Sequence, residues 1–518
     1  MANTTLFQSL RGRLLPAPRA LNHEAAPAYA FTDEHALAQY AATGCLSTTF
    51  YASAEMQLER VLALCEQVEP GFIAKTAVFA REQGYMKDMP ALLCAVLSVR
   101  DGALLERVFP RVIDNGRMLR TFVQILRSGA AGRKSLGTRP KRLVQEWLAG
   151  QSEEAVFRAS VGQSPSLADV VKMVHPRPAL PARRALYGYL IGRDHDAAAL
   201  PALVRQFEAY KTDRSQPVPD VPFQMLTALD LGRAEWTEIA RNAPWHMTRM
   251  NLQTFARHGV FEDAEVTALV AERLRDRETI RRARAFPYQL LAAYRAAVNA
   301  PRPVVEALHD AMEVATENVP ALPGKVYVCP DVSGSMTWAS VTGHRKGATS
   351  TVRCVDVAAL VAAAVLRRNP SAEVIPFEQD VVRARVDARD SVMTNAERLA
   401  GVGGGGTNCS APLAWLNRRE AKGDLVVFVS DNESWVDARR GGGATEMLRQ
   451  WSRFKQRNPQ ARLVCLDLQP YATTQAPDRE DILNIGGFSD QVFSVIDAFA
   501  QGQLRGAYFA DLAERTVL

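Results

Sequence analysis

Three loops of this 518-residue chain carry oxygen-bearing side chains at a spacing that could hold a metal ion. The segment DVSGSM (331–336) follows the apolar run KVYVC, and two polar turns come later, GVGGGGTNCS (401–410) and SDNES (430–434). In a turn that leaves a strand, alternate side chains can point at one centre, and Gly334 permits the tight bend. The candidate ligands are Asp331, Ser333, Ser335, Thr407 and Asp431. Because they offer only oxygen and two charges, they predict Mg²⁺ or a similar divalent cation that keeps waters or takes an outside ligand.

Simpler roles for these loops stay open at this point. The serines could cap the following turn, and the glycines could form an ordinary loop. No Gly-Lys-Ser/Thr follows the glycines 403–406, so a nucleotide-binding loop is not indicated. Two-metal hydrolysis would need more carboxylates than Asp331, Asp431 and Glu433. The sequence also shows no persuasive Ser/His/Asp or Cys/His set, so we predict that the protein is not an enzyme.

Residues 321–518 alternate between apolar runs and amphipathic stretches. We expect strands at 325–329, 372–377, 381–386, 424–430, 461–468 and 491–496, and helices at 353–368, 409–419, 444–457 and 497–505. This alternation predicts a doubly wound, largely parallel α/β sheet, with 381–386 as an antiparallel edge strand. Ligands of such sheets bind at the carboxyl ends of the strands, where the three polar loops should meet.

Residues 31–320 predict an all-helical array. Leu, Ala and Val recur at helical spacing in stretches such as EMQLERVLALCEQV, and Pro, Gly, Asn and Asp interrupt them every 15 to 20 residues or so. Stacked antiparallel helix pairs resembling HEAT repeats would look this way, although no fixed-period sequence repeat is visible. Residues 1–30 form an N-terminal arm in this division, and the two prolines and the glycine of ATENVPALPGK mark the boundary to the α/β domain.

The formal net charge is +6, and most of the excess positive charge lies in the helical part. No acidic residue occurs between Asp114 and Glu146, and a second acid-free stretch runs from Lys172 to Arg193. The candidate RNA-binding residues in and between these stretches are Arg117, Arg120, Arg127, Arg133, Lys134, Arg139, Lys141, Arg142, Arg158, Lys172, His175 and Arg177. Arg and Lys near helix ends suit phosphate contacts, and His175 and Tyr187 could stack on unpaired bases. The alternative is a solvated face in a chain that is rich in arginine.

Composition limits the environment of the protein. The longest apolar runs are shorter than the roughly 20 residues of a membrane span, and the N-terminus lacks a signal-peptide pattern. Seven cysteines without a CxxC pair predict reduced, buried thiols, and the histidines show no zinc-ligand spacing. We therefore expect a cytoplasmic protein without a membrane partner.

The C-terminal part resembles a known family. DVSGSM, GGT and SDNES are similar to the DxSxS, Thr and Asp elements of the von Willebrand factor A domain. The resemblance implies a metal-ion-dependent adhesion site (MIDAS), whose divalent cation completes its shell with an acidic group of a partner. All five ligand positions are filled in this sequence.

The whole chain resembles the Ro 60 kDa autoantigen family, which joins a helical TROVE domain to an A-type domain, and a bacterial Ro relative fits it best. The likeness rests on SLADVVKMVHPRP, LRTFVQILRSGAAGRKSLGTRPKRLVQEWL, MTRMNLQTFARHGVF and RARAFPYQLLAAYRAA, which occur in the family's order. It implies a monomeric ring of helical repeats closed by the A-type domain. Y RNA would bind its outer basic surface, and single-stranded 3′ ends of misfolded or precursor noncoding RNA would enter its hole.

The resemblance also implies a role in RNA quality control with exoribonucleases, notably polynucleotide phosphorylase. The family's RNA-contacting histidine falls on His175 and one of its basic positions on Arg158, but another falls on Gly162, which departs from the pattern. On charge grounds Arg133, Lys134, Lys141 and Arg142 are the expected substitutes.

The alternative function is a metal-dependent protein-adhesion scaffold, with the basic stretches incidental. In that case the A-type domain would grip an acidic partner, and Trp338 and Trp435, each close in sequence to a metal loop, would be candidate contacts.

Overall fold

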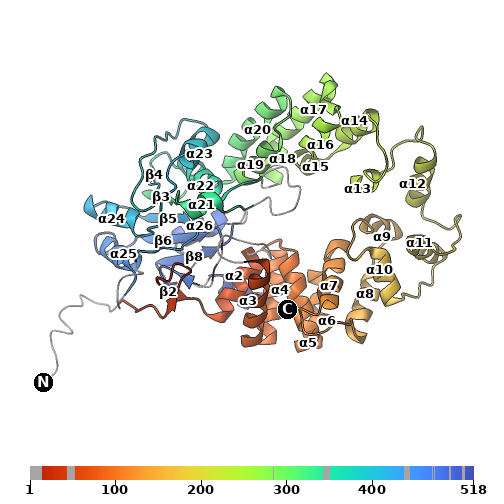
Figure 1. The fold of residues 1–518 in the computed structure, drawn as a ribbon, viewed down its shortest axis with the longest axis horizontal. Helices are drawn as coiled ribbons and strands as arrows, with labels where there is room; N and C mark the ends of the chain where they lie inside the picture. Colours follow the sequence, from red (N-terminus) through yellow and green to blue (C-terminus); the bar gives the residue numbers. More distant parts are fainter. Residues whose placement is uncertain are drawn as a thin grey trace.

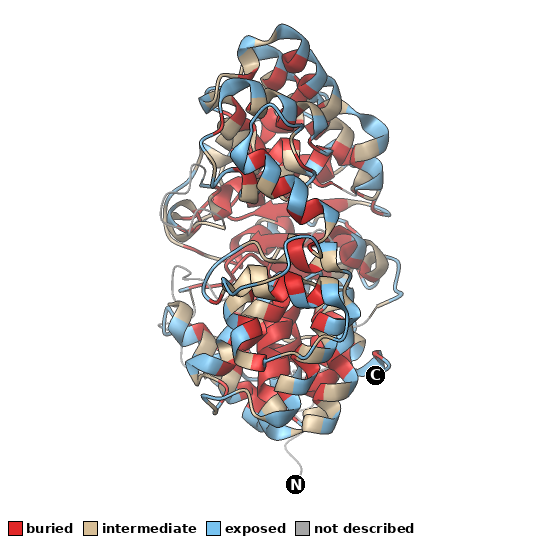
Figure 2. Ribbon diagram, turned by 90° about the vertical axis from the view of Figure 1, so that its right-hand side faces the viewer, coloured by how far each residue is buried: buried red, intermediate tan, exposed pale blue. Residues whose placement is uncertain are grey.

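The chain forms an arc of helices whose two ends are joined by an α/β domain (Figure 1). The structure, a computed structural model, describes residues 15–43, 53–283, 285–341, 351–436, 444–469, 471, 473–488, 492–504 and 508–518. The expected fold class, a helical region followed by a parallel α/β domain, is confirmed. Buried residues run along the packed faces of the helices and through the sheet, and exposed residues cover the outside (Figure 2).

The helical arc consists mainly of short helices separated by tight turns. The helices are α2 (Asp33–Thr43), α3 (Ala54–Gln67), α4 (Pro70–Glu82), α5 (Asp88–Arg100), α6 (Gly102–Val112), α7 (Gly116–Ser128), α8 (Thr138–Gly150), α9 (Glu153–Ala159), α10 (Leu167–Val174), α11 (Pro181–Ile191), α12 (Ala202–Thr212), α13 (Phe223–Leu226), α14 (Arg233–Asn242), α15 (Trp245–Met250), α16 (Leu252–Arg257), α17 (Ala264–Arg275), α18 (Arg277–Arg282), α19 (Pro287–Ala296) and α20 (Arg302–Ala315). Helix α7 shows why they form. The Asn115 side chain accepts the N–H of Met118 at its start, and Gly129 ends it in a left-handed conformation. Its apolar stripe, which includes Leu119 and Phe122, is fully buried.

The sheet of the A-type domain has five parallel strands in the order β4-β3-β5-β6-β8. They are β3 (Val326–Pro330), β4 (Glu373–Val374), β5 (Leu425–Ser430), β6 (Arg462–Asp467) and β8 (Ile482–Gly486). Alternate residues enter two separate cores: Val427 packs in the core that contains α22 (Cys354–Arg368) and α26 (Val492–Ala500), whereas Phe428 packs with α24 (Ala411–Arg418) and α25 (Glu446–Arg457). The sheet is thus covered on both faces, as the near-continuous apolar strands predict.

Two expected strands were wrong. Residues 381–386 form no strand, and only Val381 makes an isolated antiparallel bridge, to Phe377. Of the expected strand 491–496, residues 492–496 lie in α26 and residue 491 lies outside the described residues; the apolar residues 492, 493, 495 and 496, with 499, also fit one helix face, and a short apolar run does not distinguish a strand from a helix. The strand beside β6, at one edge of the sheet, is instead β8, whose central Asn484 breaks the apolar pattern. Helix α23 (Val392–Ala400) was also not expected.

Both ends of the chain help to close the arc. In the N-terminal arm, β1 (Ala20–Leu21) pairs with β2 (Pro27–Ala30), and β2 pairs with β7 (Thr473–Thr474) of the A-type domain. The C-terminal helix α27 (Tyr508–Arg515) packs on α2 and α4. Arg111 of α6 donates to the Val517 carbonyl oxygen at 2.6 Å, and Lys75 of α4 pairs with Glu514 at 2.8 Å.

The described cysteines agree with the expectation of reduced, buried thiols. Cys65, Cys94, Cys329, Cys354, Cys409 and Cys465 are buried free thiols, and Cys45 lies outside the described residues. In the part of the chain that the structure describes, no helix has the length and apolar character of a membrane span.

Candidate metal and nucleic-acid sites

The three polar loops of the A-type domain meet at the carboxyl edge of the sheet, as expected. The loop after β3 and the glycine loop are joined by main-chain hydrogen bonds, from Gly334 N to Gly405 O (2.8 Å) and from Gly404 N to Val332 O (2.8 Å). A Cβ atom on Gly334 would lie only 3.1 Å from the Gly404 carbonyl oxygen, so glycine permits this close approach. The third loop follows β5, the neighbour of β3 in the sheet.

Hydrogen bonds fix the first aspartate. Asp331 is fully buried, and its carboxylate accepts the Ser333 N–H at 2.8 Å and the Ser430 hydroxyl at 2.6 Å. The hydroxyls of Ser333 and Ser335 lie 3.2 Å apart, which brings both serines to the same place. Sequence reasoning missed Ser430, although its position as the last residue of β5 before Asp431 could have indicated it.

The second aspartate is buried but incompletely paired. Asp431 is 1% exposed, and its Oδ1 atom accepts the Glu433 N–H at 3.3 Å. Its Oδ2 atom is buried and has no hydrogen-bond partner among the described residues. Burial and the neighbouring charge of Asp331 raise the pKa of Asp431, and the Ser335 hydroxyl opposes that rise. Burial likewise raises the pKa of Asp331.

This donor set fits a hard divalent cation. Two buried carboxylates repel each other, and an unpaired buried carboxylate oxygen is costly unless a cation or a donor reaches it. Ser333 and Thr407 are also buried at this edge, and the Thr407 carbonyl oxygen accepts the Trp435 N–H at 3.4 Å. No described contact joins the Thr407 hydroxyl to the aspartates, so its assignment rests on the position of its loop. In the described residues no group of three or more His, Cys, Asp or Glu side chains could hold a metal, so the hydroxyls are essential to the proposed shell.

Six of the twelve expected RNA-binding residues line two cavities around α8 and α10, and α8 lies on the side of the arc away from its open centre (Figure 1). A cavity of about 740 Å³ is lined by Arg127, Lys134, Lys141, Arg142 and Met173 among others. A second cavity, of about 720 Å³, is lined by Lys141, His175, Pro176, Arg177 and Tyr187 among others. The two cavities share Lys141 and Gln145, so they form one continuous surface, which we call the outer basic face.

The end of α10 positions the exposed His175 on this face. His175 adopts a left-handed conformation (φ 49°) and ends the helix, with its N–H donating to the Val171 carbonyl oxygen at 3.0 Å. Gln145 of α8 donates to the Val174 carbonyl oxygen at 2.5 Å and thereby ties the two helices together. Lys172 belongs to the same region: hydrogen bonds with Ser166 are the main cause that lowers the pKa of Asp169, and the nearby charges of Lys172 and Arg127 lower it further.

Several expected residues of this face have other partners. Arg139 and Arg142 both pair with Glu106, which offsets part of their charge. Arg133 donates to the Ser98 carbonyl oxygen at 2.9 Å and is half-buried, which is a structural role. Tyr187 was expected to stack on bases, but it is only 6% exposed and packs beneath Arg183.

Arg117 and Arg158 lie apart from the outer basic face. They line a cavity of about 990 Å³ together with residues of α13, α14 and α15, including His246 and Met250. Of these helices, α13 and α15 border the open centre of the arc (Figure 1). Arg158 pairs at 2.9 Å with Asp220, and Met250 is 64% exposed. We call this surface the inner cavity.

The structure gives Gly162 a specific partner. Gly162 has a φ of +107°, and a Cβ atom there would lie 2.2 Å from a terminal nitrogen of Arg120. The glycine therefore makes room for a guanidinium from α7. Position 162 carries no charge of its own, and the Arg120 guanidinium places a positive charge next to it.

Comparisons with known proteins agree with this architecture. Residues 325–500 match the family model of the Ro60 vWA domain. The chain is 25% identical to the RNA-binding protein RO60 of Deinococcus radiodurans, with 92% of this chain and 94% of the relative covered. It is 23% identical to the RNA-binding protein RO60 of Caenorhabditis elegans, with 50% of this chain and 40% of that protein covered.

A solved structure shares the fold of nearly the whole chain. The crystal structure of the Deinococcus radiodurans Ro (RSR) protein superposes with a TM-score of 0.65 at 21% identity, covering 91% of this chain and all of that one. The resemblance to the Ro 60 kDa family is thereby confirmed over nearly the whole chain, with residues 325–500 matching the family's A-type domain.

Proposed function

We propose that this protein is a non-catalytic RNA-binding ring. Structured small RNA of the Y RNA type binds the outer basic face, and single-stranded 3′ ends of misfolded or precursor noncoding RNA enter the centre of the arc. The observation that carries the proposal is the continuous outer basic face, on which two cavities share Lys141 and present the exposed His175. The names of the two relatives, both RNA-binding proteins, support it.

The chemistry of each surface suits its RNA. Lysine and arginine side chains neutralise phosphates and release counterions, so affinity at the outer basic face should fall with salt. The inner cavity combines apolar side chains such as Met250 and Phe223 with Arg117, which suits unpaired bases and their phosphates. A role in RNA quality control beside an exoribonuclease such as polynucleotide phosphorylase belongs to the same proposal and rests on the Ro resemblance.

The A-type domain is proposed to hold Mg²⁺ through Asp331, Ser333, Ser335, Thr407 and Asp431. Asp331 and Asp431 would supply the charge, and the hydroxyls would complete the protein's share of the shell. When bound, the cation would supply an open coordination position for an outside oxygen ligand. The unpaired Oδ2 atom of Asp431 supports this assignment.

The test is the binding of one hairpin RNA, made with and without a single-stranded 3′ tail, across a salt series in Mg²⁺ and in EDTA. The double variant Lys141→Ala/His175→Ala should weaken both RNAs and reduce the salt slope by about 1 for each lost phosphate contact. Arg117→Ala should weaken only the tailed RNA. Arg302→Ala removes an equally positive, exposed side chain from α20 and should change neither. Equal, feeble binding of both RNAs by the wild-type chain would refute the proposal.

A second function, adhesion to an acidic protein partner at the metal site, is favoured by one observation. Trp338 is 81% exposed and Trp435 is 42% exposed, and both follow metal loops in the chain. Large exposed aromatic side chains are typical of interaction sites. A pull-down that captures a partner in Mg²⁺, loses it in EDTA and loses it with Asp331→Ala would support this function.

A further inference from the structure

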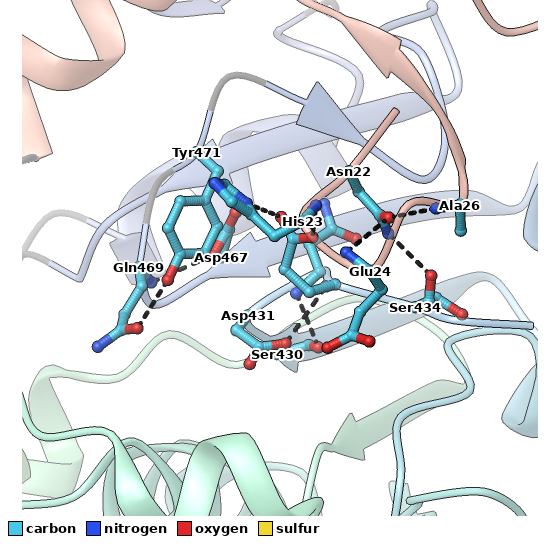
Figure 3. A network of polar contacts seen from close by, with 12 residues as sticks. Asn22, His23, Glu24, Ala26, Ser430, Asp431, Ser434, Asp467, Gln469 and Tyr471 are labelled. Carbon is cyan, nitrogen blue, oxygen red and sulfur yellow. Dashed lines mark hydrogen bonds and ion pairs between the residues drawn. The ribbon is translucent and has the colours of Figure 1, made fainter. Parts of the chain in front are cut away.

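The N-terminal arm lies directly over the loop that carries Asp431 (Figure 3). The Asn22 side chain donates to the Ser434 carbonyl oxygen at 2.8 Å. The His23 N–H donates to the Glu433 carboxylate at 2.7 Å, and the His23 ring nitrogen Nδ1 lies 3.2 Å from the other oxygen of that carboxylate. These contacts join residues more than 400 positions apart in the sequence.

The arm is itself built for this position. The Asn22 side chain accepts the Ala26 N–H at 2.8 Å and the Glu24 N–H at 3.1 Å, so it shapes the turn between β1 and β2. The His23 ring packs edge-on against Tyr471, with the ring centroids 4.8 Å apart. Asn22 is only 7% exposed, although it lies in a short two-stranded arm.

The loop under the arm, residues 433–435, contacts the segments of two proposed metal ligands, Asp431 and Thr407. Glu433 is 1% exposed, and its N–H donates to the Asp431 carboxylate. On the other side, the Ser434 hydroxyl accepts the Cys409 N–H at 3.4 Å, and Trp435 bonds the Thr407 carbonyl oxygen. Any shift of residues 433–435 therefore moves the main chain next to both Asp431 and Thr407.

We propose that Asn22 and His23 are positioning residues for the divalent cation of the A-type domain, so that closure of the arc by the arm and metal binding reinforce each other. The arm holds the Glu433 carboxylate in two contacts of its own and keeps the Asp431 loop in the conformation that meets Asp331. The inference rests on the proposed metal site and adds to it the residues that regulate it. Groups that orient metal ligands commonly change metal affinity when they are removed.

Reciprocity makes the coupling measurable from both ends. If docking of the arm strengthens metal binding by some factor, metal binding must strengthen docking of the arm by the same factor. The docked arm also holds β2 against β7, so the cation would stabilise one junction between the A-type domain and the N-terminal arm. A protein of this shape could thus open or close at that junction in response to the metal.

The first experiment measures Mn²⁺ binding to the full chain by titration calorimetry. His23→Ala and Asn22→Ala should bind Mn²⁺ about 10- to 100-fold more weakly than the wild type, the range found for groups that orient metal ligands. Leu21→Ala is the matched control, because Leu21 lies in the same arm and is 65% exposed. It should bind Mn²⁺ like the wild type.

The second experiment uses the wild-type chain alone and does not depend on whether a variant folds. Hydrogen exchange of the His23 and Ala26 amides is compared in Mg²⁺ and in EDTA. Mg²⁺ should slow exchange of these amides, because metal binding must strengthen docking of the arm if docking strengthens metal binding. A wild-type chain that binds no Mn²⁺ would refute the metal site itself. Tight Mn²⁺ binding that His23→Ala and Asn22→Ala leave unchanged, or arm exchange indifferent to Mg²⁺, would refute only the coupling.

Discussion

Replacing Asp431 by asparagine should change the stability of the A-type domain in opposite directions with and without metal. In EDTA the wild-type domain holds two buried carboxylates, and one oxygen atom of Asp431 has no hydrogen-bond partner. Above a pH of about 8, where Asp431 is ionised in the folded domain in spite of its raised pKa, removing that charge relieves the repulsion of Asp331 and ends the burial of an unpaired anionic oxygen, a penalty of about 1–3 kcal/mol. Asp431→Asn should therefore be more stable than the wild type in EDTA by about that amount.

With saturating Mg²⁺ the order should reverse. A ligand that binds only the folded state at about 1,000 times its dissociation constant stabilises that state by about 4.1 kcal/mol, which exceeds the penalty above, and the wild type alone would receive this contribution in full. For a domain of this size, such a gain corresponds to a rise of about 8–16 °C in the midpoint of unfolding. Asp431→Asn should show little response to Mg²⁺.

The measurement is hydrogen exchange of the β5 amides, because it reports on the sheet beside the site even if the helical arc unfolds separately. Asp380→Asn is the matched control, since it removes the same charge from an exposed loop near the site. It should leave the Mg²⁺ response intact. If Asp431→Asn lowered stability in EDTA, or if Mg²⁺ stabilised both proteins equally, the reasoning about buried repulsion and the metal would be wrong.

Three further predictions concern the helical part. Arg120→Ala should reduce the salt slope of RNA binding by about 1. Gly162→Ala should instead lower the stability of the protein, because a side chain at φ +107° is strained and collides with the Arg120 guanidinium. Filter binding and thermal unfolding of both variants separate the two effects. Arg133→Ala should lower the unfolding midpoint, as it frees the Ser98 carbonyl oxygen, while the exposed Lys134→Ala should lower RNA affinity and leave the midpoint unchanged. Burial raises the pKa of Cys65 to about 12 and also raises the pKa of Cys94, so both thiols stay protonated in the folded protein at pH 9. Iodoacetamide reacts with the thiolate, so mass spectrometry should find these two cysteines labelled only in denaturant. Because the thiols ionise more easily in the unfolded chain, the free energy of unfolding also depends on pH. It is constant with respect to these thiols below the unfolded thiol pKa near 8.5, and above that pH it decreases by about 1.4 kcal/mol per pH unit for each thiol. Labelling of either cysteine in the native protein at pH 9 would contradict the burial.

The sequence by itself determined the class of each domain and the chemistry of the metal loops. Apolar residues at helical spacing indicate a helix that buries one face, and a near-continuous apolar run indicates a strand that is buried on both faces. The spacing of apolar residues therefore predicts a layer of helices in the first domain and a sheet covered on both sides in the second. The loops after β3 and β5 could be paired in advance, because parallel strands end at one edge of their sheet. The same local pattern misled where it was short: residues 491–496 satisfy a strand and a helix equally, and only packing in the core with β6 decided for α26.

Only the tertiary structure decided which charges are available and which distant residues meet. Eight positive residues between Asp114 and Glu146 look alike in the sequence, yet Arg133 is held by a carbonyl oxygen, Arg117 turns to the inner cavity, and Lys141 joins the two outer cavities. No local rule relates Gly162 to Arg120 or His23 to Glu433. The Gly162 contact exists because the segment after α9 packs on α7, and the His23 contact exists because the N-terminal arm meets the domain that closes the arc.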